Sequence, residues 1–133
     1  MDLKQLTEEV ETVSQMYAER NGFDRDATWL LLKLQEEVGE LTQAFLRKTG
    51  QGRAKGLTAE ELQGSFRSEL ADVLGHVLLL ARHDGIDLQA EVEVKWLSRN
   101  PEWVQRHASV AHPHSAGSSG VSGAVLSEPL PSR

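Results

Sequence analysis

Residues 29–41, WLLLKLQEEVGEL, and residues 69–80, ELADVLGHVLLL, decide the fold, because each combines a helical apolar stripe with acidic side chains at its border. Apolar residues recur every three or four positions in both stretches, which is the spacing of one helix face. In the first stretch and its continuation they are Leu30, Leu34, Val38, Leu41 and Phe45. No proline precedes Pro101, so helices are favoured throughout this part of the chain.

Four segments are expected to be helical, at about residues 2–20, 26–48, 58–83 and 87–100. Asp26 and Thr58 are suitable N-caps, and Thr58 with Glu61 forms a capping-box pattern. We therefore predict an all-α fold, a four-helix bundle. Its core is small for a single chain, so we expect oligomerisation to complete it.

The C-terminal segment differs in composition from the rest of the chain. Residues 108–133 hold seven Ser, three Gly and three Pro, which together make up half of these 26 positions. Such a segment has too few apolar side chains to bury. We predict a helical domain at residues 1–107 and a disordered, low-complexity tail at 108–133.

Composition excludes several classes of protein. The chain has no cysteine, which excludes disulfide scaffolds and thiolate metal sites. The net charge of -6 and the absence of a basic cluster argue against a nucleic-acid partner. No apolar run is long enough for a membrane span, and residues 1–5 do not resemble a signal peptide. We expect a cytoplasmic protein that contacts neither membrane nor nucleic acid.

The acidic residues beside the two stripes are the candidate site. At about 100° per residue, an arc that borders the first stripe holds Glu36, Glu37 and Glu40. Glu69 and Asp72 border the second stripe in the same way. If the helices pack by their stripes, five carboxylates meet at one partly buried seam. Each carboxylate in such a cluster must be protonated or find a cation, and Mg²⁺, with Mn²⁺ as an alternative, suits an all-oxygen site. The alternative is that both groups are ordinary solvated helix faces.

Other polar and aromatic residues share this region. Trp29 either stacks on a nucleobase or packs in the core or an interface. Lys33 either binds phosphate or pairs with Glu37 one turn away. We interpret His76, one turn beyond Asp72, as a supporting or packing residue rather than a metal ligand. A di-iron site is disfavoured, because the chain lacks the Glu-x-x-His pairs that such bundles use.

The two acidic motifs together resemble those of a known family. The pattern E-E-x-x-E, 28 further residues and then E-x-x-D is similar to that of the MazG-like all-α nucleoside triphosphate pyrophosphohydrolases. The resemblance extends over roughly residues 25–100. The stretches that carry it run from Leu32 to Leu41, from Glu69 to Leu74, from Gly85 to Leu88 and from Lys95 to Asn100.

The resemblance implies a four-helix core assembled as a homodimer or homotetramer. It implies Mg²⁺-dependent cleavage of a (deoxy)nucleoside triphosphate between the α- and β-phosphates, which yields a monophosphate and pyrophosphate and could clear unwanted nucleotides. The implied metal ligands are Glu37, Glu40, Glu69 and Asp72. Glu36 and Glu37 are the catalytic candidates, with Glu36 as a further ligand or as the base that activates water. Lys95 and Asn100 fall in a segment that contacts phosphate in relatives, often from a neighbouring subunit.

Two alternatives stay open at this point. Residues 71–76, ADVLGH, are somewhat similar to a stretch of the phosphoribosyl-ATP pyrophosphatase of histidine biosynthesis. The other alternative is a non-catalytic, nucleotide-binding helical oligomer.

Overall fold

The computed structural model describes residues 1–108, and this part of the chain is helical without any strand. The predicted all-α fold class is confirmed. The elements, in order, are α1 (Leu3–Asn21), α2 (Ala27–Lys48), α3 (Ala59–His83), α4 (Leu88–Lys95), the short 3₁₀ helix η1 (Leu97–Arg99) and α5 (Pro101–Ala108).

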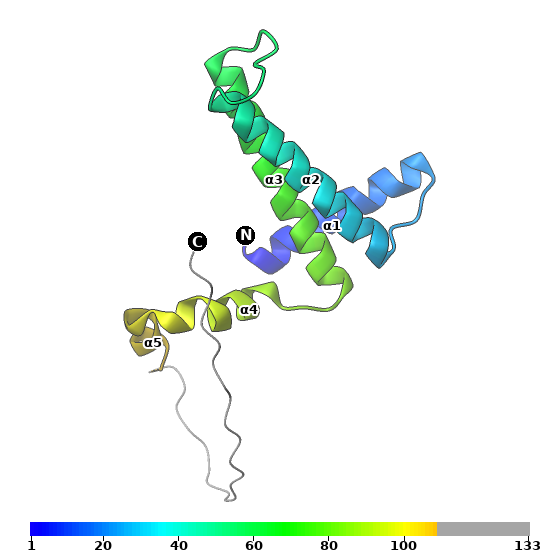
Figure 1. The fold of residues 1–133 in the computed structure, drawn as a ribbon. Coiled ribbons are helices and arrows are strands. Elements are labelled where there is room, and N and C mark those ends of the chain that lie inside the picture. The colour runs from blue at the N-terminus through cyan, green and yellow to red at the C-terminus, as the bar shows by residue number, and fades with distance from the viewer. Residues whose placement is uncertain (109–133) are drawn as a thin grey trace, which may run out of the picture.

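A long antiparallel hairpin of α2 and α3 is the centre of the fold (Figure 1). Both helices begin where the capping residues predict. The side chain of Asp26 accepts a hydrogen bond from the Trp29 N–H, and Thr58 forms a complete capping box with Glu61. These caps satisfy N–H groups that have no partner within the helix. They therefore fix where each helix starts and, with it, which side chains face the partner helix.

Helix α1 lies across the hairpin and contacts α3. Three arginine–glutamate contacts hold α1 in this position. Arg25, in the loop before α2, pairs with Glu11 at 2.7 Å. Arg82 of α3 approaches Glu8 at 3.0 Å and Glu11 at 3.5 Å. Glu11 is thus held by cations from two other parts of the chain. Its pKa is lowered, first by the hydrogen bond from Arg25 and also by the charges of Arg25 and Arg82.

The hydrophobic core of the described residues is thin. Its buried members are Ala18, Leu30, Ala44, Leu62, Leu78, Leu79 and Ala81. Part of each predicted apolar stripe is open to solvent in the single chain, because neighbouring elements cover only one side of it. The exposed members include Val38, Phe45, Leu70 and Leu74, with 38–47% of their surface accessible.

The bounds predicted for the fourth helix, about residues 87–100, are wrong. Helix α4 ends at Lys95, and the chain then forms η1 before it starts a separate helix at Pro101. Proline is well suited to a first helical position, and the side chain of Asn100 accepts hydrogen bonds from the N–H groups of Glu102 and Trp103. Elements α4, η1 and α5 extend away from the hairpin as an arm (Figure 1).

Among residues 1–108, no helix is long and apolar enough to cross a membrane. Apart from Ala108, the predicted tail at residues 108–133 lies outside the described residues.

Replacing Glu11 with glutamine should lower the free energy of unfolding by about 1–3 kcal/mol at neutral pH, because Arg25 and Arg82 lose a charged acceptor. A carboxyl with a lowered pKa stabilises the fold above its unfolded pKa, and this contribution is lost as the pH falls through its folded pKa. The difference between the two proteins should therefore shrink below about pH 4. Urea unfolding at several pH values measures it, with Glu9→Gln, an exposed change on the same helix, as the control. A difference that does not vary with pH would refute the ion-pair explanation.

Candidate metal centre

Carboxylates from both helices of the hairpin meet midway along it. Glu37 and Glu40 lie one turn apart on α2, and Glu69 lies opposite them on α3. One carboxylate oxygen from each of the three lies within 4.8 Å of the other two. We refer to Glu37, Glu40 and Glu69 as the acid group. The sequence predicted five carboxylates at one seam, and the antiparallel packing of the two capped helices brings three of them together.

The three members of the acid group differ in exposure. Glu37 is only 8% exposed and is the one buried charged residue among those described. Glu69 is partly buried, whereas Glu40 is exposed. The acid group therefore extends from the buried Glu37 in the hairpin to Glu40 at the solvent-exposed surface.

The ionised form of the Glu69 carboxyl is disfavoured by its surroundings. Burial raises the pKa of this carboxyl, and the negative charges of Glu40, Asp72 and Glu37 raise it further. Arg47 acts in the opposite direction but has a smaller effect. One oxygen of Glu69, Oε2, is buried without a hydrogen-bond partner in the described part of the chain. Burying a carboxylate oxygen without a partner costs folding free energy, and a positively charged ligand would offset this cost.

The donor set fits a hard divalent cation. The acid group offers only carboxylate oxygens, which are the ligands that Mg²⁺ and Mn²⁺ prefer. The unpaired Glu69 oxygen supplies the acceptor that such an ion would satisfy. The three residues of the acid group are thus fit to hold a magnesium-like ion, and their role as ligands stays a prediction.

The other two predicted acidic residues lie beside the acid group rather than within it. Asp72 is exposed, one turn after Glu69, and is close enough for its charge to raise the pKa of Glu69. Glu36 is exposed and accepts a hydrogen bond from Lys33 at 2.9 Å. In this structure Glu36 is therefore directed to the lysine, and only Glu37, Glu40 and Glu69 meet.

Two basic side chains approach the buried end of the acid group. Lys33 Nζ lies 3.6 Å from Glu37 Oε1, so this lysine contacts both Glu36 and Glu37. Its pKa is raised, first through the hydrogen bond to Glu36. His76 Nε2 lies 3.7 Å from the same oxygen of Glu37. The expected pairing of Lys33 with Glu37 is present, together with a closer contact to Glu36.

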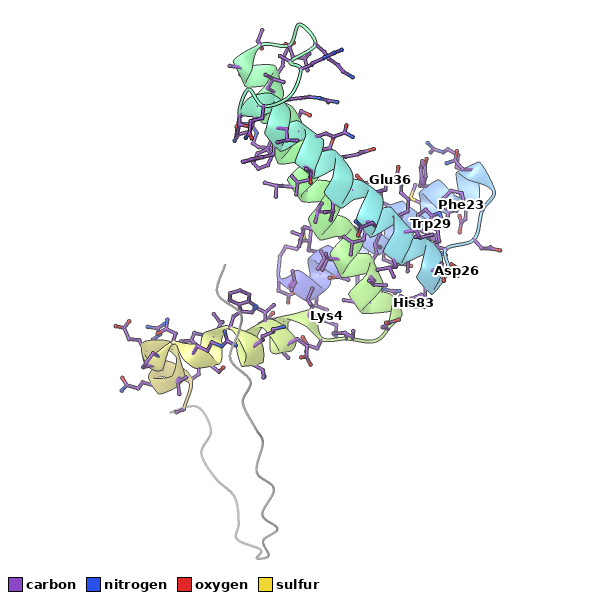
Figure 2. The ribbon with its side chains drawn as sticks, viewed as in Figure 1. Lys4, Phe23, Asp26, Trp29, Glu36 and His83 are labelled. Atoms are coloured by element: carbon purple, nitrogen blue, oxygen red, sulfur yellow. The ribbon has the colours of Figure 1, made fainter. Side chains whose placement is uncertain are left out.

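An aromatic row leads from α1 to this end of the site. The rings of Tyr17, Phe23 and Trp29 follow one another at centroid distances of 5.8 and 5.0 Å. Trp29 then packs against the His76 ring at 6.4 Å. Figure 2 shows Phe23 and Trp29 close together near the start of α2, with Glu36 further along it. Sequence reasoning missed Phe23, and its only signal was an aromatic residue within the polar connection between the first two helices.

Lys95 and Asn100 do not join the acid group within one chain. Lys95 is exposed at the end of α4, and Asn100 caps α5, so both belong to the arm that extends away from the hairpin (Figure 1). A role in the same site requires the arm of another subunit or a movement of the arm.

One comparison with known proteins identifies a family. A family model described as the MazG nucleotide pyrophosphohydrolase domain matches residues 25–102, which include both helices of the hairpin and the start of the arm's last helix. No curated protein and no solved structure matches the chain.

Replacing Glu69 with glutamine distinguishes the effect of charge repulsion on stability from the effect of a bound ion. Without metal, the variant should be more stable than the wild type, by about 0.2–0.5 kcal/mol for each like-charged neighbour that is relieved. With Mg²⁺, it should lose most of the rise in melting temperature that we expect for the wild type. Thermal unfolding with and without Mg²⁺ tests both effects, with Glu9→Gln as the matched control. A Glu69→Gln protein that Mg²⁺ still stabilises like the wild type would contradict the assignment.

Proposed function

Because the chain belongs to the MazG nucleotide pyrophosphohydrolase family, we propose that it hydrolyses (deoxy)nucleoside triphosphates between the α- and β-phosphates. Water adds to one of the two phosphorus atoms and gives up a proton, and the bond from that phosphorus to the bridging oxygen breaks, so the products are a nucleoside monophosphate and pyrophosphate. The observation that carries the proposal is the convergence of Glu37, Glu40 and Glu69 at one partly buried point. A role in clearing unwanted nucleotides is consistent with this reaction.

In this proposal the carboxylates of Glu37, Glu40 and Glu69, with Asp72 at their edge, hold Mg²⁺. When bound, such an ion neutralises charge on the phosphates and makes a bound water more acidic. Without it, an acidic chain would repel a triphosphate, because the carboxylates and the phosphates carry the same sign. The requirement for a divalent ion therefore follows from charge as well as from ligand type.

Glu36 is the proposed base. It is exposed to water beside the acid group and would accept the proton of the attacking water through its carboxylate. Glu37 is the other catalytic candidate, but it is buried and also contacts His76. Both glutamates contact Lys33, so the difference between them is the exposure of Glu36 to water. The position of Lys33 next to Glu36 would also place a positive charge near the phosphates.

Trp29 is proposed to form one wall for the nucleobase. It is only partly buried, so some of its indole surface is available to a planar ring. Its contacts with Phe23 and His76 hold the indole in place near the buried end of the acid group.

We also propose that the protein acts as a homodimer or homotetramer. The exposed apolar residues of α2 and α3, Val38, Phe45, Leu70 and Leu74 among them, are the surface that a second copy would cover. Assembly would also account for the distance between the arm and the acid group, since Lys95 and Asn100 would then serve the site of a neighbouring subunit.

Incubation of the purified protein with Mg²⁺ and each of the common nucleoside and deoxynucleoside triphosphates, and separately with phosphoribosyl-ATP, tests the reaction. We expect monophosphate and pyrophosphate, rather than diphosphate and phosphate, from at least one of them, and none after chelation of the metal. Glu40→Ala should abolish turnover, whereas Glu9→Gln should not change it. Absence of these products for every nucleotide would favour a non-catalytic, nucleotide-binding oligomer. Exclusive cleavage of phosphoribosyl-ATP would favour an enzyme similar to the phosphoribosyl-ATP pyrophosphatase.

A mixing experiment tests whether the arm serves a neighbouring subunit. Glu40→Ala and Lys95→Ala proteins should each be inactive or nearly so. After the two are unfolded and refolded together, mixed oligomers should contain some sites with neither lesion, so part of the activity should return. If Lys95→Ala is inactive and mixing restores nothing, the arm acts within its own chain. If Lys95→Ala is fully active, this lysine has no part in the reaction.

A further inference from the structure

The carboxylate of Glu37 is contacted on one oxygen by two basic side chains from different helices. Lys33 Nζ of α2 and His76 Nε2 of α3 lie 3.6 and 3.7 Å from Oε1. Lys33 makes its shorter contact with Glu36, at 2.9 Å, so it is shared between two carboxylates. His76 has no such second acidic contact among the described residues. It is therefore the side chain whose polar contact is directed to Glu37 alone.

The ring of His76 is held in this direction by its surroundings. Its side chain is only 17% exposed, and the edge of Trp29 packs on it with an angle of 60° between the rings. Trp29 is itself packed against Phe23 at 5.0 Å. These contacts restrict the rotation of the imidazole, so Nε2 stays directed to the glutamate.

The hydrogen-bonding pattern indicates which nitrogen carries the hydrogen. Nδ1 of His76 is buried and has no hydrogen-bond partner within residues 1–108. A neutral imidazole has one donor and one acceptor nitrogen. With the hydrogen on Nε2, the donor is directed to the carboxylate and only an acceptor is left unpaired. The opposite tautomer would bury an unpaired N–H and place a second acceptor against the glutamate.

From this geometry we propose that His76 is a positioning residue, whose Nε2–H donates a hydrogen bond to the Glu37 carboxylate when an ion is bound and so keeps it in the orientation in which it meets Glu40 and Glu69. The proposal rests on the proposed function, because it concerns the carboxylates that would hold the ion. Carboxylates that bind metals are commonly hydrogen-bonded in turn, and loss of such a partner weakens metal binding. The present separation of 3.7 Å is longer than a hydrogen bond, so we expect it to shorten when the ion binds.

Three substitutions of His76 distinguish this role from packing. The side-chain nitrogen of glutamine lies at the same number of bonds from the backbone as Nε2, whereas that of asparagine corresponds to Nδ1. His76→Gln should therefore retain most of the affinity for Mg²⁺, and His76→Asn and His76→Leu should each weaken it by about 10-fold or more. The matched control is His83→Leu on the same helix, whose histidine is exposed and contacts Asp84 instead.

The measurement is Mg²⁺ binding to the full chain without nucleotide, by calorimetry and by thermal unfolding at increasing Mg²⁺ concentration. Circular dichroism checks that each variant is folded, and if the leucine variant is not, the glutamine and asparagine pair decides alone. Equal affinities for the asparagine, glutamine and wild-type proteins would overturn the positioning role while leaving the metal site intact. If the wild type itself does not bind Mg²⁺, the proposed metal site fails and the role of His76 fails with it.

Discussion

Three carboxylates that meet within 4.8 Å repel one another, and in this chain they are supplied by two helices that must pack together to bury their apolar faces. The packing of α2 on α3 thus brings like charges together at the centre of the hairpin. At Glu69, burial first and then the neighbouring negative charges raise the pKa of the carboxyl, and one of its oxygens is buried without a hydrogen-bond partner among the described residues. In the proposed function a divalent cation would relieve this repulsion, because carboxylate oxygens are its preferred ligands. The other residues of the site are arranged around these three carboxylates.

The surroundings of the acid group are asymmetric. At its buried end, Lys33 and His76 approach Glu37 and the aromatic row packs behind them. At its other end, Glu40 and Asp72 are open to solvent. Water and ions therefore have access to the acid group from the Glu40 side. The arrangement suits a reaction in which charge must be neutralised and water must be present, as in the hydrolysis of a phosphoanhydride.

Local signals made most of the fold predictable. The caps at Asp26 and Thr58 and the periodic leucines gave the bounds of the hairpin, and a spacing of three residues placed Glu37 and Glu40 on one helix face. The break at Trp96 and the helix that starts at Pro101 were not foreseen, since a proline can end one helix or begin the next. Nor could the sequence show that Val38 and Leu70 are exposed in the single chain or that Lys95 lies on an arm that extends away from the hairpin, because both depend on how the helices are arranged in space.

The most direct test of the central claim is the anomalous scattering of Mn²⁺ in crystals of the protein. If the carboxylates of α2 and α3 share one ion, an anomalous peak should lie within ligand distance of Glu37, Glu40 and Glu69 and should disappear from crystals grown with a chelator. A structure in which Mn²⁺ binds elsewhere, or in which these three side chains turn apart into solvent with Mn²⁺ present, would contradict it.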